Sequence, residues 1–276
     1  TVNIIGLIVG LMMLFSPAFI FNDIILCFVR NDGNPRLSMI ATVCGSLFNV
    51  VFDYIFIFPC NMGMLGAVLA TGFSPVVGLT IMSPHWLGKK RGFHFRKLVP
   101  DADSIRTNIS LGFPSLLSQI SAAIVMIIFN MLILDLEGNT GVAAYGVIAN
   151  ISLVVLSFYT GIAQGIQPLV SHSYGRKKTD GIRQFLRYAM ISMVILSAVM
   201  YLILFVFADP IASAFNSEHN AKLQEIAITG LKLYFTSLVF AGFNIILSMY
   251  FTSVEKALPA QIISLLRGLI LIIPIA

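Results

Sequence analysis

Residues 37–58 read LSMIATVCGSLFNVVFDYIFIF, and this stretch decides the class of fold because it is apolar apart from a few small or polar residues. An α-helix of this length just crosses a hydrocarbon core of about 30 Å. Asp53 stands inside the stretch, and Asn49 lies one helical turn before it on the same face. A carboxylate at that depth costs several kcal/mol unless it meets a partner, water or a proton, so it is a functional candidate by default.

The composition of the whole chain has too few charges for a soluble protein. Of its 276 residues, 58% are hydrophobic and 11% are charged, whereas a soluble domain is about 25% charged. The chain is therefore expected to be an integral membrane protein. The net charge of +5 does not indicate nucleic-acid binding, because the basic residues lie in short loops between apolar segments.

Eight apolar segments follow one another along the chain. Helices are the plausible membrane-spanning structures for them, because continuous apolar runs lack the alternation of barrel strands. The sequence therefore predicts an all-α integral membrane protein, a two-lobed polytopic bundle with eight transmembrane helices. The segments are Val2–Val29, Leu37–Phe58, Met64–Leu87, Asn108–Leu134, Val142–Val170, Phe185–Ala208, Ile226–Val254 and Pro259–Ala276.

The charges of the loops predict how these helices are oriented. All but two of the 17 Lys and Arg residues lie in or beside the loops after the first, third, fifth and seventh segments, and Lys222 and Lys232 alone lie on the other side. The positive-inside rule makes the basic loops cytoplasmic. The basic residues are Arg30, Arg36, Lys89, Lys90, Arg91, Arg96, Lys97, Arg106, Arg176, Lys177, Lys178, Arg183, Arg187, Lys256 and Arg267.

A basic loop rich in aromatic residues divides the chain into two bundles. We expect residues 1–87 to form the second half of an amino-terminal lobe with three transmembrane helices, and residues 108–276 to form most of a carboxy-terminal lobe with five, the last of them truncated. Residues 88–107 would be a cytoplasmic linker whose cations face anionic lipid headgroups. Because the chain starts at Thr1 without Met and ends within an apolar run, we also expect a fragment of a longer protein.

The best candidate for an ion-coupling site is formed by Asp53, Asn49 and Thr71. The helix that carries Thr71 runs antiparallel after a tight turn, so Thr71 and Asp53 lie at matching depth to within about one helical turn. A carboxylate with an amide and a hydroxyl beside it can hold a proton or lightly coordinate Na⁺. The alternative is a structural hydrogen-bonded cluster that holds two helices together. For Asp23, snorkelling to the interface and a role in the cavity stay equally open.

Two later segments carry polar faces that predict a substrate cavity. Gln119 and Asn130 lie on one face of the fourth segment, and Asn150 and Gln164 lie on one face of the fifth. Such faces would line a bundle interior or a water-filled cavity. Close packing of small residues explains the neighbouring Ser, Ala and Gly positions equally well.

No enzymatic constellation is present in the sequence. It contains no phosphate-binding loop, no helical zinc motif and no nucleophile elbow. The three cysteines have neither disulfide nor zinc spacing, so we expect no metal site. A membrane-embedded enzyme or a structural membrane subunit is therefore less favoured than a transporter.

Several motifs resemble the multidrug and toxin extrusion (MATE) family of prokaryotes. The stretch FVRNDGNPRLSMIATVCGSLFNVVFDYIFIF (28–58), followed by GMLGAVLAT (63–71), resembles its arginine, Gly-x-Pro turn and Asn-x-x-x-Asp-Tyr pattern. GIAQGIQPLVSHSYGRKK (161–178) resembles its helix rich in glycine, glutamine and proline, and SLLRGLILIIP (264–274) resembles its penultimate helix. The resemblance covers the chain as the fourth to the eleventh of twelve helices.

The resemblance implies a monomeric antiporter of the cytoplasmic membrane that exports amphipathic, often cationic compounds in exchange for H⁺ or Na⁺, with no other cofactor. Asn49, Asp53 and Thr71 match the family's amino-lobe proton network, whose first-helix Asp would lie outside this fragment. Ala122 stands where some members carry a Glu, and the segment Ile226–Val254 contains no acid. Coupling through the amino lobe is therefore expected. The alternative is a flippase for lipid-linked oligosaccharides or polyprenyl lipids of the same superfamily.

Overall fold

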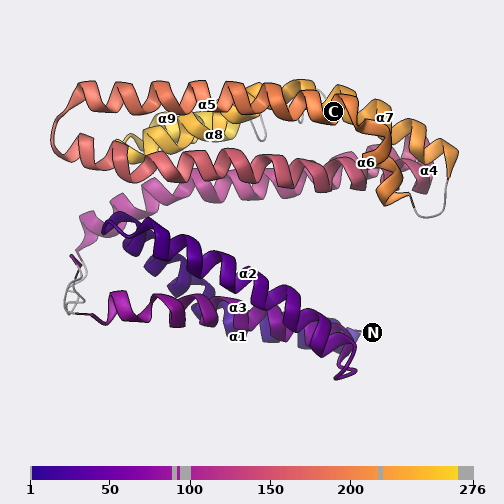
Figure 1. Ribbon diagram of the computed structural model, residues 1–276, viewed down its shortest axis with the longest axis horizontal. Coiled ribbons are helices and arrows are strands. Elements are labelled where there is room, and N and C mark those ends of the chain that lie inside the picture. The colour runs from indigo at the N-terminus through magenta and orange to yellow at the C-terminus, as the bar shows by residue number, and fades with distance from the viewer. Residues whose placement is uncertain (1, 89–91, 94–100, 217–219, 267–276) are drawn as a thin grey trace. The chain divides into compact units, whose positions relative to one another are not determined.

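The computed structural model describes residues 2–88, 92–93, 101–216 and 220–266, which are helical nearly throughout and contain no strand (Figure 1). The predicted all-α fold is therefore confirmed. The chain divides into two compact units, which we call unit 1 (Thr1–Leu98) and unit 2 (Val99–Ala276). The assignment of residues 1–87 and 108–276 to two lobes joined by a linker stays a prediction.

Unit 1 consists of α1 (Val2–Asn31), α2 (Pro35–Ile57) and α3 (Gly63–Trp86). The side chain of Asn34 accepts a hydrogen bond from the N–H of Leu37, and Pro35 supplies the backbone angle that the first helical position needs. These two residues therefore fix the start of α2 at Pro35.

Helices α2 and α3 pack along a seam of small residues. The hydroxyl of Ser74 donates to the carbonyl of Gly45 at 2.9 Å, and further along the seam Gly66 lies against Phe56. A Cβ on Gly66 would stand 2.7 Å from the Cβ of Phe56, so the approach requires glycine. This close packing brings the polar side chains of the two helices within reach of one another.

Unit 2 begins with α4 (Ala102–Gly175), which is two helices joined at Gly138. The backbone of Gly138 is not helical (φ 66°, ψ −158°), and the chain turns back there. The rings of Phe129 and Tyr145, one on each side of the turn, stack with their centroids 6.0 Å apart. The predicted segments Asn108–Leu134 and Val142–Val170 are these two helices.

The rest of unit 2 packs around the second helix of α4. Tyr159 is fully buried there, and its hydroxyl lies 2.7 Å from the hydroxyl of Ser197 on α5. The remaining elements are α5 (Thr179–Val206), α6 (Ala208–Phe215), α7 (Ala221–Tyr234), the short 3-10 turn η1 (Phe235–Ser237), α8 (Leu238–Ser253) and α9 (Ala257–Leu265). Helix α6 is absent from the predicted segments, because eight residues cannot span a membrane.

Six helical stretches of the described chain are long and apolar enough to cross a membrane. One of them is α4, which contains two helices joined at Gly138. Another consists of α7, η1 and α8 and corresponds to the predicted segment Ile226–Val254. Helix α9 is the start of the last predicted segment, of which residues 267–276 lie outside the described range. The same holds for the linker residues Lys89, Lys90, Arg91, Arg96 and Lys97 and for Arg267.

The seam of unit 1 predicts opposite effects for one substitution at two glycines. Gly66→Ala is expected to lower the free energy of unfolding by about 1–3 kcal/mol, because the new methyl group pushes α3 away from Phe56. Gly10→Ala on α1 is the control, since no described atom lies within 4 Å of its Cβ position and alanine favours a helix by about 1 kcal/mol. Thermal unfolding in detergent measures both. A Gly66→Ala variant as stable as Gly10→Ala would contradict the packing.

Candidate functional site

Two of the three predicted ion-site residues touch. The side-chain amide of Asn49 on α2 donates to the hydroxyl oxygen of Thr71 on α3 at 3.2 Å. Both residues are half-buried. The sequence predicts that Thr71 and Asp53 lie at the same depth to within one helical turn. The hydroxyl of Thr71 contacts Asn49, which lies one turn before Asp53. The interaction leaves the hydroxyl proton of Thr71 free for an acceptor.

Asp53 lies one turn further along α2, and its carboxylate is the least satisfied polar group of the site. Its Oδ1 atom is buried and has no hydrogen-bond partner among the described residues. The neighbouring face of α2 carries the rings of Phe48, Phe52 and Phe56, whose successive centroids are 4.0 and 5.4 Å apart. A buried carboxylate oxygen without a hydrogen-bond partner is a candidate for binding a proton or another cation.

A second buried oxygen in unit 1 lies outside the predicted site. The Oδ1 atom of Asn22 on α1 is buried without a partner among the described residues, and a Cβ on Gly78 would stand 2.5 Å from it. The side chain thus fits against α3 because residue 78 is glycine. Asp23, next in sequence, is exposed. Sequence reasoning favoured the acid over its amide neighbour, although both are polar residues within an apolar segment.

The four predicted cavity residues lie on α4, but the structure does not bring them into one cluster. Gln119 and Asn150 are exposed, and Asn130 and Gln164 are half-buried. No hydrogen bond joins two of them in the part of the chain that the structure describes. In the second helix of α4 the buried positions form a different face from that of Asn150 and Gln164. The buried residues are Gly141, Ala144, Val147, Ile148, Ser152, Val155, Tyr159, Ala163, Val170 and Ser173.

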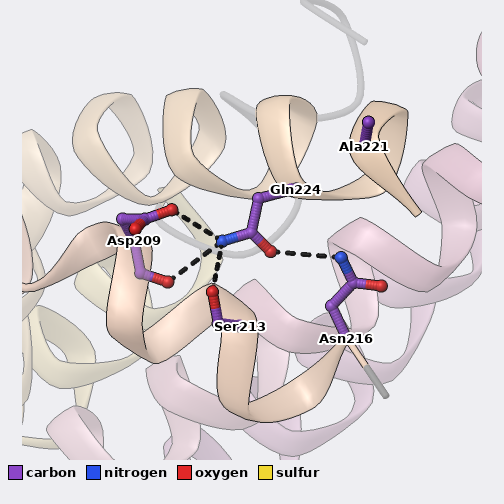
Figure 2. Close-up of a pocket in the computed structure, with 5 residues that line it drawn as sticks. All are labelled: Asp209, Ser213, Asn216, Ala221 and Gln224. Atoms are coloured by element: carbon purple, nitrogen blue, oxygen red, sulfur yellow. Dashed lines mark hydrogen bonds between the residues drawn. The ribbon is translucent and has the colours of Figure 1, made fainter. Parts of the chain in front are cut away.

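A polar hollow of about 240 Å³ lies between α6 and α7 (Figure 2). The amide nitrogen of Gln224 lies 2.8 Å from the carboxylate of Asp209, 3.0 Å from its backbone carbonyl and 2.7 Å from the hydroxyl of Ser213. The amide of Asn216 donates in turn to Gln224 at 3.2 Å. These bonds fasten the short helix α6 to α7, so the hollow is explained as a structural junction. The sequence shows no local signal for it.

A wider, mostly apolar hollow of about 530 Å³ lies between the start of α4 and α9. Ile105, Ile109 and Phe113 line it together with the cation Arg106, and the amide of Gln261 donates to the carbonyl of Ser110 at 3.2 Å across it. Its volume is within the range of small-molecule sites. An apolar wall with one cation differs from the amide-lined cavity that the sequence predicts.

The described residues contain no group of three or more His, Cys, Asp or Glu side chains that could hold a metal ion. The candidate site therefore consists of one carboxylate with an amide and a hydroxyl nearby. Such a set is suited to reversible protonation or to weak cation binding rather than to catalysis.

Comparison with known proteins gives one family. The MatE family model matches residues 114–276. Multidrug export protein MepA of Staphylococcus saprophyticus is 24% identical over 263 residues, which cover 95% of this chain and 57% of that protein. MepA of Staphylococcus aureus is 22% identical over the same length. The chain thus spans a little more than half the length of these relatives.

Solved structures agree in fold. The crystal structure of MATE in complex with MaL6 has a TM-score of 0.86 at 23% identity and covers 95% of this chain and 59% of that chain. A MOP superfamily transporter from Pyrococcus furiosus, whose binding pocket is described as having reverse polarity, has a TM-score of 0.85 at 25% identity. That similarity covers 94% of this chain and 58% of the other.

The contact between Asn49 and Thr71 predicts a specific loss of stability. Thr71→Val keeps the shape of the side chain but leaves the amide without its acceptor, so the free energy of unfolding should fall by about 1 kcal/mol. Thr71→Ser should retain most of it. Thr80→Val, on the exposed side of the same helix, removes only a bond to the carbonyl of Val76 and serves as the control. Equal stabilities of Thr71→Val and Thr71→Ser would contradict the contact.

Proposed function

Because the chain belongs to the MatE family, we propose that it forms part of a multidrug efflux antiporter that exports amphipathic or cationic compounds from the cell in exchange for H⁺ or Na⁺. Members of the family are transporters, in agreement with the prediction that the chain is not an enzyme. The chain is a multi-pass protein of the cell membrane. The names of the MepA relatives support export of drugs over the flipping of lipid-linked sugars.

Asp53 is the ion-responsive acid of this proposal, and its buried Oδ1 atom is the observation that carries it. An ionised carboxylate without a partner is unstable in an apolar bundle, so Asp53 changes its charge with the ion that it meets. Asn49 and Thr71 hold α2 and α3 together one turn away. A change in the charge of Asp53 therefore takes place one turn from the hydrogen bond that joins α2 to α3.

H⁺ fits this set of groups better than Na⁺. A proton needs one oxygen atom, and the Oδ1 atom of Asp53 supplies it. A metal cation is held by several oxygens at once. Asn49 directs its N–H group rather than its carbonyl to Thr71 and already occupies a lone pair of that hydroxyl. None of the described hydrogen bonds brings another oxygen atom to the Oδ1 atom of Asp53.

Exchange follows from competition for the charge of Asp53. The ionised carboxylate attracts a cationic compound, and protonation removes that attraction and favours release. The two ligands thus bind with opposite preference, which is the thermodynamic requirement for antiport. We assign the contacts with the polar parts of such compounds to four amide side chains of α4, which the structure does not bring into one cluster: Gln119, Asn130, Asn150 and Gln164. We propose that membrane lipid surrounds the protein. We also propose that it is a monomer, because a transporter with both lobes in one chain does not need a second copy.

Replacement of Asp53 tests the coupling role. In everted vesicles with the full-length protein, Asp53→Asn should reduce proton-driven ethidium transport at least about tenfold, the factor that corresponds to 1.4 kcal/mol. Asp53→Glu should retain part of the activity because it keeps the acid. Asp180→Asn, an exposed acid in the first turn of α5, removes the same charge outside the site and should transport normally. Undiminished transport by Asp53→Asn would refute the proposal.

The coupling ion is tested with imposed gradients. A pH gradient alone should drive ethidium transport, and added ethidium should dissipate that gradient in return, because exchange is reciprocal. A Na⁺ gradient at equal pH on both sides should drive none. Transport with the Na⁺ gradient alone would show that Asp53 exchanges a metal cation rather than a proton.

A further inference from the structure

Three separate parts of unit 1 meet at the carboxylate of Asp32. This residue follows α1 in the turn that leads to α2. The backbone N–H of Gly92, beyond the end of α3, points at both carboxylate oxygens, with N···O distances of 2.8 and 3.0 Å. The Nε2 atom of His85, in the last turn of α3, lies 3.0 Å from Oδ2. One side chain thus joins the α1–α2 turn, the end of α3 and the segment that follows it.

Gly92 fits this contact because it has no side chain. A Cβ on Gly92 would overlap the Oδ1 atom of Asp32. Glycine therefore supplies the N–H donor and also the space that lets the carboxylate come so close. Two independent features of residue 92 point to the same partner.

An aromatic contact accompanies the polar one. The ring of Phe93 lies 5.1 Å from the ring of Phe28 on α1 and 6.3 Å from the ring of His85, measured between centroids. Phe93 also packs against the buried cluster of α1, α2 and α3 that contains Ile25 and Met82. Residues 92 and 93 are thus held to unit 1 by an acid on one side and by apolar packing on the other.

We propose that Asp32 is a clasp that fastens Gly92–Phe93 to the ends of α1 and α3, so that the chain leaves unit 1 from a fixed point and not from the end of α3. The loop charges place all of these residues on the predicted cytoplasmic side. The clasp keeps the two cytoplasmic helix ends together with the beginning of the inter-bundle linker. It is independent of the transport chemistry proposed for Asp53.

The clasp requires a carboxylate and not merely a polar side chain of its size. A carboxylate only accepts hydrogen bonds and can take donors on both oxygens, whereas asparagine turns one N–H₂ group toward one of them. The side chains of Asp32 and His85 are 20% and 17% exposed, so water competes weakly for their contact. Charged acceptors in such places make bonds about twice as strong as neutral ones. Asp32→Asn should therefore open the clasp without removing its volume.

Hydrogen–deuterium exchange of the full-length protein in detergent tests the proposal directly. In Asp32→Asn, a peptide that contains Gly92 and Phe93 should exchange at least about tenfold faster than in the wild type, the factor expected for one lost charge-assisted bond. His85→Phe keeps a ring but removes the donor to Oδ2, and should give a smaller acceleration in the same peptide. Asp180→Asn makes the same chemical change at an exposed acid of unit 2 and should leave that peptide unchanged. Equal exchange of Gly92–Phe93 in wild type and Asp32→Asn would overturn the clasp.

A double-mutant cycle gives a second measurement that does not rely on exchange. Gly92→Ala should lower the thermal midpoint in the wild-type background, because the methyl group displaces the carboxylate. In an Asp32→Ala background the same change should cost much less, since the atom that it meets is gone. Additive effects of the two substitutions would refute the contact. Where a variant is too unstable to purify, the exchange of the Gly92–Phe93 peptide in Asp32→Asn decides the matter.

Discussion

The bilayer offers no water to polar groups, and the structure of this protein depends on that constraint. Backbone groups are satisfied within helices, and polar side chains must find partners along helix seams. Asn49 with Thr71 and Tyr159 with Ser197 do so. Asp53 does not, because its Oδ1 atom is buried without a partner among the described residues. This exception is the reason why we propose Asp53 as the ion-responsive acid.

Glycine has two different uses in the described parts of this protein. In unit 1 it permits contact, since a Cβ on Gly66 would strike Phe56 and one on Gly92 would strike Asp32. In the second helix of α4, no described atom lies within 4 Å of the Cβ positions of Gly161 and Gly165. Glycine thus allows close helix packing at Gly66, whereas at Gly161 and Gly165 the space around the helix is open. Gln164 lies between these two glycines in the sequence.

Much of the fold could be predicted because spanning helices are long, apolar and separated by charged loops. The segments around residues 134–142 show the limit: the sequence indicates two helices there, but the turn itself depends on the backbone of Gly138. Part of the site could also be predicted, since 1.5 Å per residue on both sides of a tight turn sets Asn49, Asp53 and Thr71 at similar depth. The burial of Asn22 could not, because its side chain fits against Gly78 of another helix.

The sequence by itself determined the membrane class, the helical segments, the family resemblance and the candidate acid Asp53, because composition, hydrophobic length and motifs are local properties of the chain. Only the tertiary structure decided which polar groups are paired. It joined Asn49 rather than Asp53 to Thr71, fastened α6 to Gln224, and brought Gly92 to Asp32 from sixty positions away. Hydrogen bonds between helices depend on rotation and spacing within tenths of an ångström, and those are properties of packing rather than of sequence order.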